Sequence, residues 1–122
     1  MCARILIVDD DQTISSLFSL DCESRNSDII INSAASGEEA IEAIERIRPQ
    51  VLVLDLRMVK GDGFSVLDHL KSIGSTMPVV VLTNYKNATY ESRCKEYGVR
   101  NYLIKHEHPM SRIVDTVQAC LP

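Results

Sequence analysis

Residues 51–55 read Val-Leu-Val-Leu-Asp, four consecutive apolar residues followed at once by an acid. A half-exposed strand alternates apolar and polar side chains, whereas this run has no polar face, so it is typical of a strand buried on both sides. The same pattern recurs along the chain, and its weakest copy, which ends at Lys105, predicts an edge strand. The other runs are Ile5–Val8, Ile29–Ile31, Val79–Leu82 and Tyr102–Ile104.

Segments with helical spacing lie between and after these runs. Residues 36–39 have the form of a capping box, in which Ser36 accepts a hydrogen bond from the third helical N–H and Glu39 reaches back, and Pro49 closes the helix that follows. The other predicted helices are Gln12–Glu23, Phe64–Lys71, one that Asn87 caps and that ends at Tyr97 before Gly98, and one whose first turn holds Pro109.

Strand and helix therefore alternate five times along 122 residues. Because crossovers between parallel strands are right-handed, this order predicts an α/β fold, a doubly wound parallel sheet with helices on both faces. The length suits one domain, which we expect to span residues 1–122.

Charge and cysteine usage exclude several classes of partner. The balance of 13 basic against 17 acidic residues gives a formal charge of −4, which argues against direct binding to nucleic acid or to an anionic membrane. The four cysteines show no CxxC spacing, so neither a zinc site nor a redox pair is indicated. No export signal is visible, and we expect a cytoplasmic protein with free thiols.

The predicted strands end in polar residues, and ligands of such sheets bind beyond those ends. Asp9 and Asp10 follow the first strand and Asp55 follows the third, and packing brings these two strand ends side by side. Three neighbouring carboxylates repel one another unless a positive charge intervenes. Mg²⁺, which takes oxygen ligands, is the expected cation.

Two further strand ends add groups that suit an incoming phosphate. Lys105 supplies a second positive charge, and Thr83 supplies a hydroxyl donor. Neither a P-loop nor a GxGxxG motif is present, so a nucleotide enzyme is not indicated. What remains is aspartyl-phosphate chemistry, in which a carboxylate attacks phosphorus.

The whole chain resembles the receiver domain of two-component response regulators, the CheY-like family. The resemblance rests on Ile-Leu-Ile-Val-Asp-Asp at 5–10, Val-Leu-Val-Leu-Asp-Leu-Arg-Met at 51–58 with Asp62-Gly63, Val-Val-Val-Leu-Thr at 79–83 and Tyr-Leu-Ile-Lys at 102–105. It implies a flavodoxin-like (βα)5 fold with strand order 2-1-3-4-5.

The resemblance also assigns roles around the expected metal. It implies that Asp55 is the phosphoacceptor and a ligand of Mg²⁺ or Mn²⁺, that Asp10 is a direct ligand and that Asp9 holds the metal through water. The backbone carbonyl of Arg57 would complete the protein ligands. The implied phosphodonor is the phosphohistidine of a sensor histidine kinase or phosphotransfer protein.

The remaining implied roles concern switching. Thr83 would move toward the phosphate, Lys105 would pair with it, and Tyr102 would change rotamer and remodel the face of the fourth helix, fifth strand and fifth helix for a downstream protein. The chain would catalyse its own phosphorylation and dephosphorylation without being an enzyme for another substrate. It would act as a monomer or as a phosphorylation-dependent dimer.

Four positions depart from the family pattern. Val59 and His106 stand where proline is usual, and a cis peptide before a non-proline residue costs roughly 2.5–4 kcal/mol, so the Lys105–His106 bond is expected to be trans. Arg57 and Asn84 line the route of an attacking water, and we expect them to alter the lifetime of the phosphorylated state.

Two other functions are compatible with the pattern. A phosphorylation-independent interaction module would keep the fold and bind its partner constitutively, without needing Mg²⁺ or Asp55. An aspartate-based phosphatase of similar topology is disfavoured because these residues include no cap domain to enclose a substrate.

Overall fold

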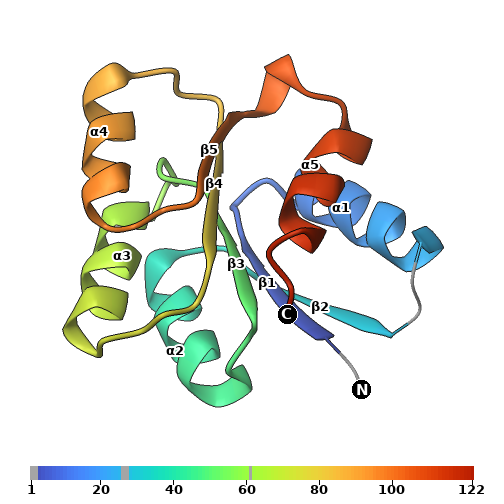
Figure 1. Ribbon diagram of the computed structural model, residues 1–122, viewed down its shortest axis with the longest axis horizontal. Helices are drawn as coiled ribbons and strands as arrows, with labels where there is room; N and C mark the ends of the chain where they lie inside the picture. Colours follow the sequence, from blue (N-terminus) through green and yellow to red (C-terminus); the bar gives the residue numbers. More distant parts are fainter. Residues whose placement is uncertain (1–2, 26–27, 61) are drawn as a thin grey trace.

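Five parallel strands form one sheet in the computed structural model, which describes residues 3–25, 28–60 and 62–122 (Figure 1). The strand order is β2-β1-β3-β4-β5, which confirms the predicted topology and places β5 at an edge. The strands are β1 (Ala3–Val8), β2 (Ile29–Ala34), β3 (Val51–Leu54), β4 (Val79–Thr83) and β5 (Asn101–Ile104).

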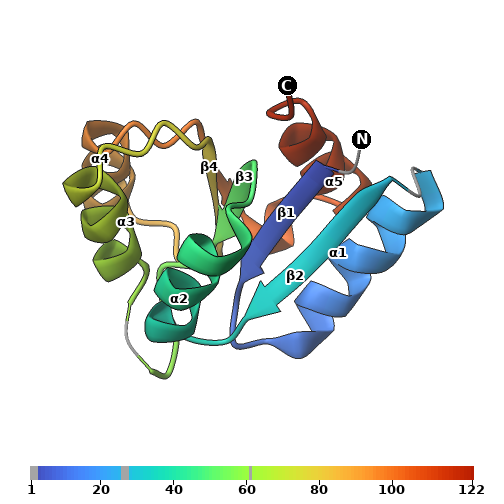
Figure 2. The same ribbon diagram turned by 90° about the horizontal axis from the view of Figure 1, so that it is seen from below.

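Helices cover both faces of the sheet. Helices α1 and α5 lie on one face, and α2, α3 and α4 lie on the other (Figure 2). In the part of the chain that the structure describes, none of them has the length and apolarity that a membrane crossing requires. The helices are α1 (Gln12–Arg25), α2 (Gly37–Ile47), α3 (Gly63–Ser72), α4 (Ala88–Glu96) and α5 (Met110–Gln118), with a 3-10 turn η1 (Lys105–Glu107) after β5.

The three central strands send alternate side chains into two separate cores. Leu52 and Leu54 of β3 belong to the core beneath α2, α3 and α4, whereas Val51 and Val53 belong to the core beneath α1 and α5. All four side chains are buried, as are those of residues 5–8 of β1. The absence of a polar face in these runs is therefore explained by burial on both sides.

Helix ends follow the sequence signals with three differences. Ser36 accepts a hydrogen bond from the N–H of Glu39 (3.2 Å) as expected, but the Glu39 carboxylate accepts from the N–H of Ala35 (2.7 Å) instead of that of the cap residue. Asp62 caps α3 by accepting from the N–H of Ser65 (3.1 Å), a cap that the sequence reading missed. Pro109 precedes α5 as its extended cap residue, so its placement in the first turn was wrong.

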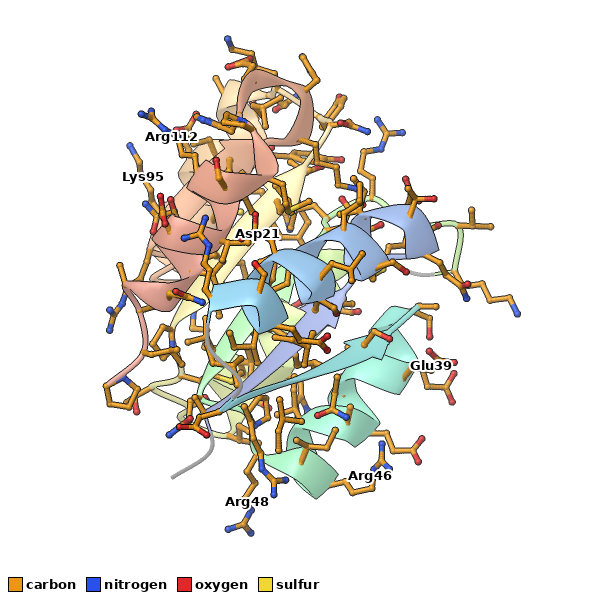
Figure 3. All side chains as sticks on the ribbon, turned by 90° about the vertical axis from the view of Figure 1, so that its right-hand side faces the viewer. Asp21, Glu39, Arg46, Arg48, Lys95 and Arg112 are labelled. Atoms are coloured by element: carbon orange, nitrogen blue, oxygen red, sulfur yellow. The ribbon has the colours of Figure 1, made fainter. Side chains whose placement is uncertain are left out.

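Arg25 links the end of α1 to α5 through ion pairs and a hydrogen bond. Its Nε lies 2.6 Å from the carboxylate of Asp21, its guanidinium also pairs with the carboxylate of Asp115, and Nη2 donates to the carbonyl of Ser111 (2.9 Å). Figure 3 shows Asp21 on the side of α1 that faces α5. The two helices are thereby joined at the surface above their shared core.

Gly63 allows α3 to begin directly against the end of β3. Its N–H donates to the carbonyl of Leu56 (2.9 Å), and a Cβ at this position would lie 2.7 Å from the carbonyl oxygen of Asp55 and 2.9 Å from the Cα of Leu56. Both of these are backbone atoms, which cannot rotate away. A side chain here would therefore displace either α3 or the segment that carries Asp55.

We expect Gly63→Ala to destabilise the protein by about 1–3 kcal/mol, the usual cost of overpacking. Gly37→Ala is the matched control, because a Cβ at Gly37 meets the rotatable hydroxyl of Ser65 (2.9 Å) and backbone only at 3.4 Å. Urea unfolding followed by circular dichroism measures both variants. Equal stability of the two would contradict the close approach at Gly63.

Candidate functional site

Backbone hydrogen bonds hold Asp9 and Asp55 at the carboxyl ends of the central strands. The N–H of Asp9 donates to the carbonyl of Ala34 (3.0 Å), and the N–H of Asp55 donates to the carbonyl of Val8 (2.9 Å). These bonds extend the ladders of β1 with β2 and with β3 by one residue. The two acids are consequently buried, with exposed fractions of 3% and 6%.

Three carboxylates meet at this edge of the sheet, as the sequence predicted. One oxygen each of Asp9, Asp10 and Asp55 lies within 4.8 Å of the others. Asp10 is exposed and accepts a hydrogen bond from the N–H of Val59 (2.8 Å), which orients its side chain. Asp11 is not part of this cluster: its carboxylate accepts from the N–H of Thr13 (3.0 Å) at the start of α1.

The donor set fits a hard divalent cation. It consists of carboxylate oxygens alone, it includes one exposed acid, and it lies beside a pocket open to solvent. Mg²⁺ characteristically takes one or two carboxylates and keeps several waters, so two buried acids and one exposed acid suit it. The N–H of Arg57 donates to the carboxylate of Asp55 (3.2 Å), which places Arg57 next to the cluster, and the role of its carbonyl as a ligand stays a prediction.

Lys105 neutralises the cluster from the end of β5. Its Nζ lies 2.6 Å from Oδ2 of Asp9 and 3.1 Å from Oδ2 of Asp55, and only 8% of its side chain is exposed. The described residues contain no cis peptide, so the bond between Lys105 and His106 is trans. The turn η1, which the sequence reading did not predict, follows at once, and Lys105 nevertheless points at both acids.

The pKa values of this pair reflect burial opposed by charge. Burial raises the pKa of Asp9, and the hydrogen bond from Lys105 offsets only part of that effect. Burial alone would lower the pKa of Lys105, but its hydrogen bond to Asp9 and the charge of Asp55 raise it instead. The lysine therefore keeps its charge at neutral pH, and a bound cation would oppose the effect of burial by favouring the ionised form of Asp9.

Thr83 lies in the same pocket as the acceptor acid. Its side chain is buried, and its Oγ1 accepts a hydrogen bond from the N–H of Tyr85 (3.2 Å), which leaves its own proton available. The pocket has a volume of about 390 Å³, enough for a phosphoryl group with water. Its lining includes Asp10, Asp55, Arg57, Thr83, Asn84, Tyr85 and Lys105.

Tyr85 is a residue of this pocket that the sequence reading missed. The guanidinium of Arg57 lies 4.4 Å from the centre of its ring, and the hydroxyl of Tyr102 donates to its carbonyl (2.6 Å). Burial raises the pKa of Tyr102 to about 12. A tyrosine two residues after a strand carries no motif, so only the folded structure reveals that it joins these groups.

A comparison with protein families decides the classification. A profile described as "Response regulator receiver domain" matches residues 5–118. The chain belongs to the response regulator receiver family. The matched range includes every residue of the acidic cluster together with Thr83 and Lys105.

Curated relatives are about 30% identical to this receiver over the matched region. It is 29% identical over 118 residues to "Regulator of RpoS" of Escherichia coli (strain K12), covering 97% of the chain and 34% of that protein. It is 33% identical over 118 residues to "Transcriptional regulatory protein PrrA" of Mycobacterium leprae (strain TN), covering 97% and 49%. The receiver thus spans between a third and a half of these two relatives.

Solved structures agree with the fold. The N-terminal domain of an uncharacterised protein (WS1339) from Wolinella succinogenes is 28% identical with a TM-score of 0.86, covering 98% of this chain and 94% of that one. Chemotaxis protein CheY4 of Vibrio cholerae, 23% identical, has the same TM-score and covers 99% and 100%. At that identity the second likeness concerns the fold alone.

In a Lys105→Met variant, the free energy of unfolding is expected to fall below that of the wild type as the pH rises. Because the folded pKa of Lys105 lies above the ordinary 10.5, its ion pairs stabilise the fold wherever Asp9 and Asp55 are ionised and are lost at high pH only above that value. In Lys105→Met, Asp9 loses its partner and its folded pKa rises further, so the variant becomes progressively less stable than the wild type from about pH 4 to pH 7. We expect a loss of about 2–3 kcal/mol at pH 7, below that of a fully enclosed pair because the pocket opens to solvent.

Metal-free urea unfolding across this pH range measures the effect. Lys86→Met is the control, because the Lys86–Glu107 pair (3.3 Å) is exposed and contributes little. If both variants lost the same stability at pH 7, Lys105 would not be the charge that balances the acids.

Proposed function

We propose that this receiver accepts a phosphoryl group from the phosphohistidine of a sensor histidine kinase or phosphotransfer protein onto the carboxylate of Asp55. The observation that carries the proposal is the contact of one buried ammonium, that of Lys105, with both Asp9 and Asp55. Such a group neutralises an acceptor that would otherwise repel an anionic donor. The hydroxyl of Thr83 lines the same pocket and is available to a phosphoryl oxygen.

The transfer needs no group beyond those in the pocket and a divalent cation. An oxygen of Asp55 attacks phosphorus, the P–N bond of the donor breaks, and its electron pair stays on the imidazole nitrogen, giving an acyl phosphate. Asp9 and Asp10, with Asp55 itself, would hold Mg²⁺ or Mn²⁺, which supplies charge neutralisation for the phosphoryl oxygens. Hydrolysis by water breaks the new P–O bond and restores the carboxylate.

The chain is in this account the substrate of its own reaction and not an enzyme for another molecule. A passive interaction module would need no such pocket, yet all five groups expected for phosphorylation meet in one place. Those groups are Asp9, Asp10, Asp55, Thr83 and Lys105. The phosphorylation-independent alternative is therefore not favoured.

The consequence of phosphorylation is a change in the surface around Tyr102. This side chain lies half-buried on the edge strand β5 and packs on the face of the sheet that α4 covers. Its hydroxyl donates to the carbonyl of Tyr85 in the connection that follows Thr83. We infer that a downstream protein binds this α4–β5–α5 face, with a second receiver copy as one possible partner. Buried free thiols at Cys22 and Cys94 suit the cytoplasm, the compartment we propose.

Incubation with acetyl phosphate or phosphoramidate tests the proposal. We expect one phosphoryl adduct per chain by intact mass, and we expect it to be absent without Mg²⁺ or in Asp55→Asn. Glu23→Gln is the control, because Glu23 is an exposed acid of α1 outside the pocket. No adduct in the wild type, with trapping by beryllofluoride also negative, would overturn the proposal in favour of the passive module.

Mg²⁺ is expected to stabilise the folded chain by relieving repulsion in the cluster. At a concentration ten times its Kd, the gain is about 1.4 kcal/mol, because the unfolded chain offers no such site. A thermal unfolding series measures it, with most of the gain lost in Asp10→Asn and kept in Glu23→Gln, which removes an exposed acid outside the pocket. Equal gains in all three proteins would place the cation elsewhere.

A further inference from the structure

Tyr85 is the point at which three groups of the candidate site are joined. Its N–H donates to Oγ1 of Thr83 (3.2 Å), its carbonyl accepts from the hydroxyl of Tyr102 (2.6 Å), and its ring lies under the guanidinium of Arg57 at 4.4 Å. The first two contacts use the main chain, and only the third uses the side chain. The position of this one residue therefore affects both Thr83 and Tyr102.

The far side of Tyr85 is anchored to the start of α4. Its ring meets that of Tyr90 edge-on with centroids 4.9 Å apart, and its hydroxyl accepts from the side-chain amide of Asn87 (3.2 Å). Tyr90 in turn meets Phe64 of α3 edge-on at 5.2 Å. The ring is thus held between the pocket on one side and the helices α3 and α4 on the other.

The contact between Arg57 and the Tyr85 ring is the one in this set that a phosphoryl group on Asp55 would affect most directly. The N–H of Arg57 donates to the carboxylate of Asp55 (3.2 Å), so its side chain starts beside the acceptor, and both Arg57 and Tyr85 line the pocket. A guanidinium gains more from a charge-assisted hydrogen bond to a phosphoryl oxygen than from the face of a half-buried ring such as that of Tyr85. A phosphoryl group therefore competes with the Tyr85 ring for Arg57.

We propose that the Arg57–Tyr85 pair is a latch that holds residues 84–87 in the resting arrangement and opens when Arg57 turns to a phosphoryl group on Asp55. The latch rests on the proposed function and specifies its regulation. With the ring released, Tyr85 is free to follow Thr83 toward the phosphate, and the acceptor of the Tyr102 hydroxyl moves with it. Tyr85 is a positioning residue, which acts through Thr83 and Tyr102.

The test is a double-mutant cycle on beryllofluoride affinity, measured with Mg²⁺ by ¹⁹F NMR. Tyr85→Leu keeps both main-chain bonds and removes the ring, so the resting arrangement loses stability and beryllofluoride binds about three- to tenfold more tightly, the range expected from the loss of one cation–π contact. In the Arg57→Gln background the same substitution tightens binding by a clearly smaller factor, because no guanidinium remains to be held and only the ring's contacts with Tyr90 and Asn87 are lost. Tyr85→Phe, which keeps the ring, behaves more like the wild type than like Tyr85→Leu.

Tyr97→Leu is the matched control, since the ammonium of Lys71 lies 5.8 Å from the ring of Tyr97 outside the pocket. A second readout needs no ligand: in metal-free hydrogen exchange, residues 84–87 exchange at least threefold faster in Tyr85→Leu and in Arg57→Gln, and at the wild-type rate in Tyr97→Leu. These variants remain folded if their circular dichroism and cooperative unfolding match the wild type.

The outcomes separate the latch from the function on which it rests. Tightening of equal size in both Arg57 backgrounds, or unchanged affinity in Tyr85→Leu, would overturn the latch and leave phosphorylation of Asp55 intact. Failure of the wild type to bind beryllofluoride at all would overturn the proposed function and the latch with it.

Discussion

The ammonium of Lys105, in contact with the buried carboxylates of Asp9 and Asp55, is the interaction on which the site depends. The two acids are buried because they extend the central strands β1 and β3, where the sheet is covered on both faces. Neither strand carries a positive charge at its carboxyl end, so the neutralising group has to come from elsewhere. It comes from the end of the edge strand β5, and the pairing of β5 with β4 therefore also determines the electrostatics of the acceptor.

In this arrangement the negative charge of the resting pocket is only partly neutralised. One lysine faces three acids, and the pKa of Asp9 is raised by burial despite its partner. A divalent cation and an anionic phosphoryl group together would complete the balance, which is why the geometry suits a site that binds both. The contacts around Tyr85 connect the pocket to α4 and β5, the region in which we propose that a partner detects the change.

Much of this was predictable because it depends on local pattern and topology. Apolar runs without alternation indicated doubly buried strands, and their order placed Asp9, Asp10 and Asp55 at one edge. The features that the sequence reading missed depend on tertiary contacts. Asp62 caps α3 after the loop that follows β3, and η1 begins at Lys105, whose ammonium contacts two distant acids. The contacts of Tyr85 come from neighbours on three different segments.

A crystal structure of the chain with Mg²⁺ and beryllofluoride would test the central claim most directly. The account predicts beryllium bonded to a carboxylate oxygen of Asp55, Mg²⁺ beside Asp10, and the ammonium of Lys105 turned to a fluorine. Beryllofluoride bound at another residue, or a pocket in which Lys105 keeps both of its present contacts while Asp55 stays unmodified, would contradict it.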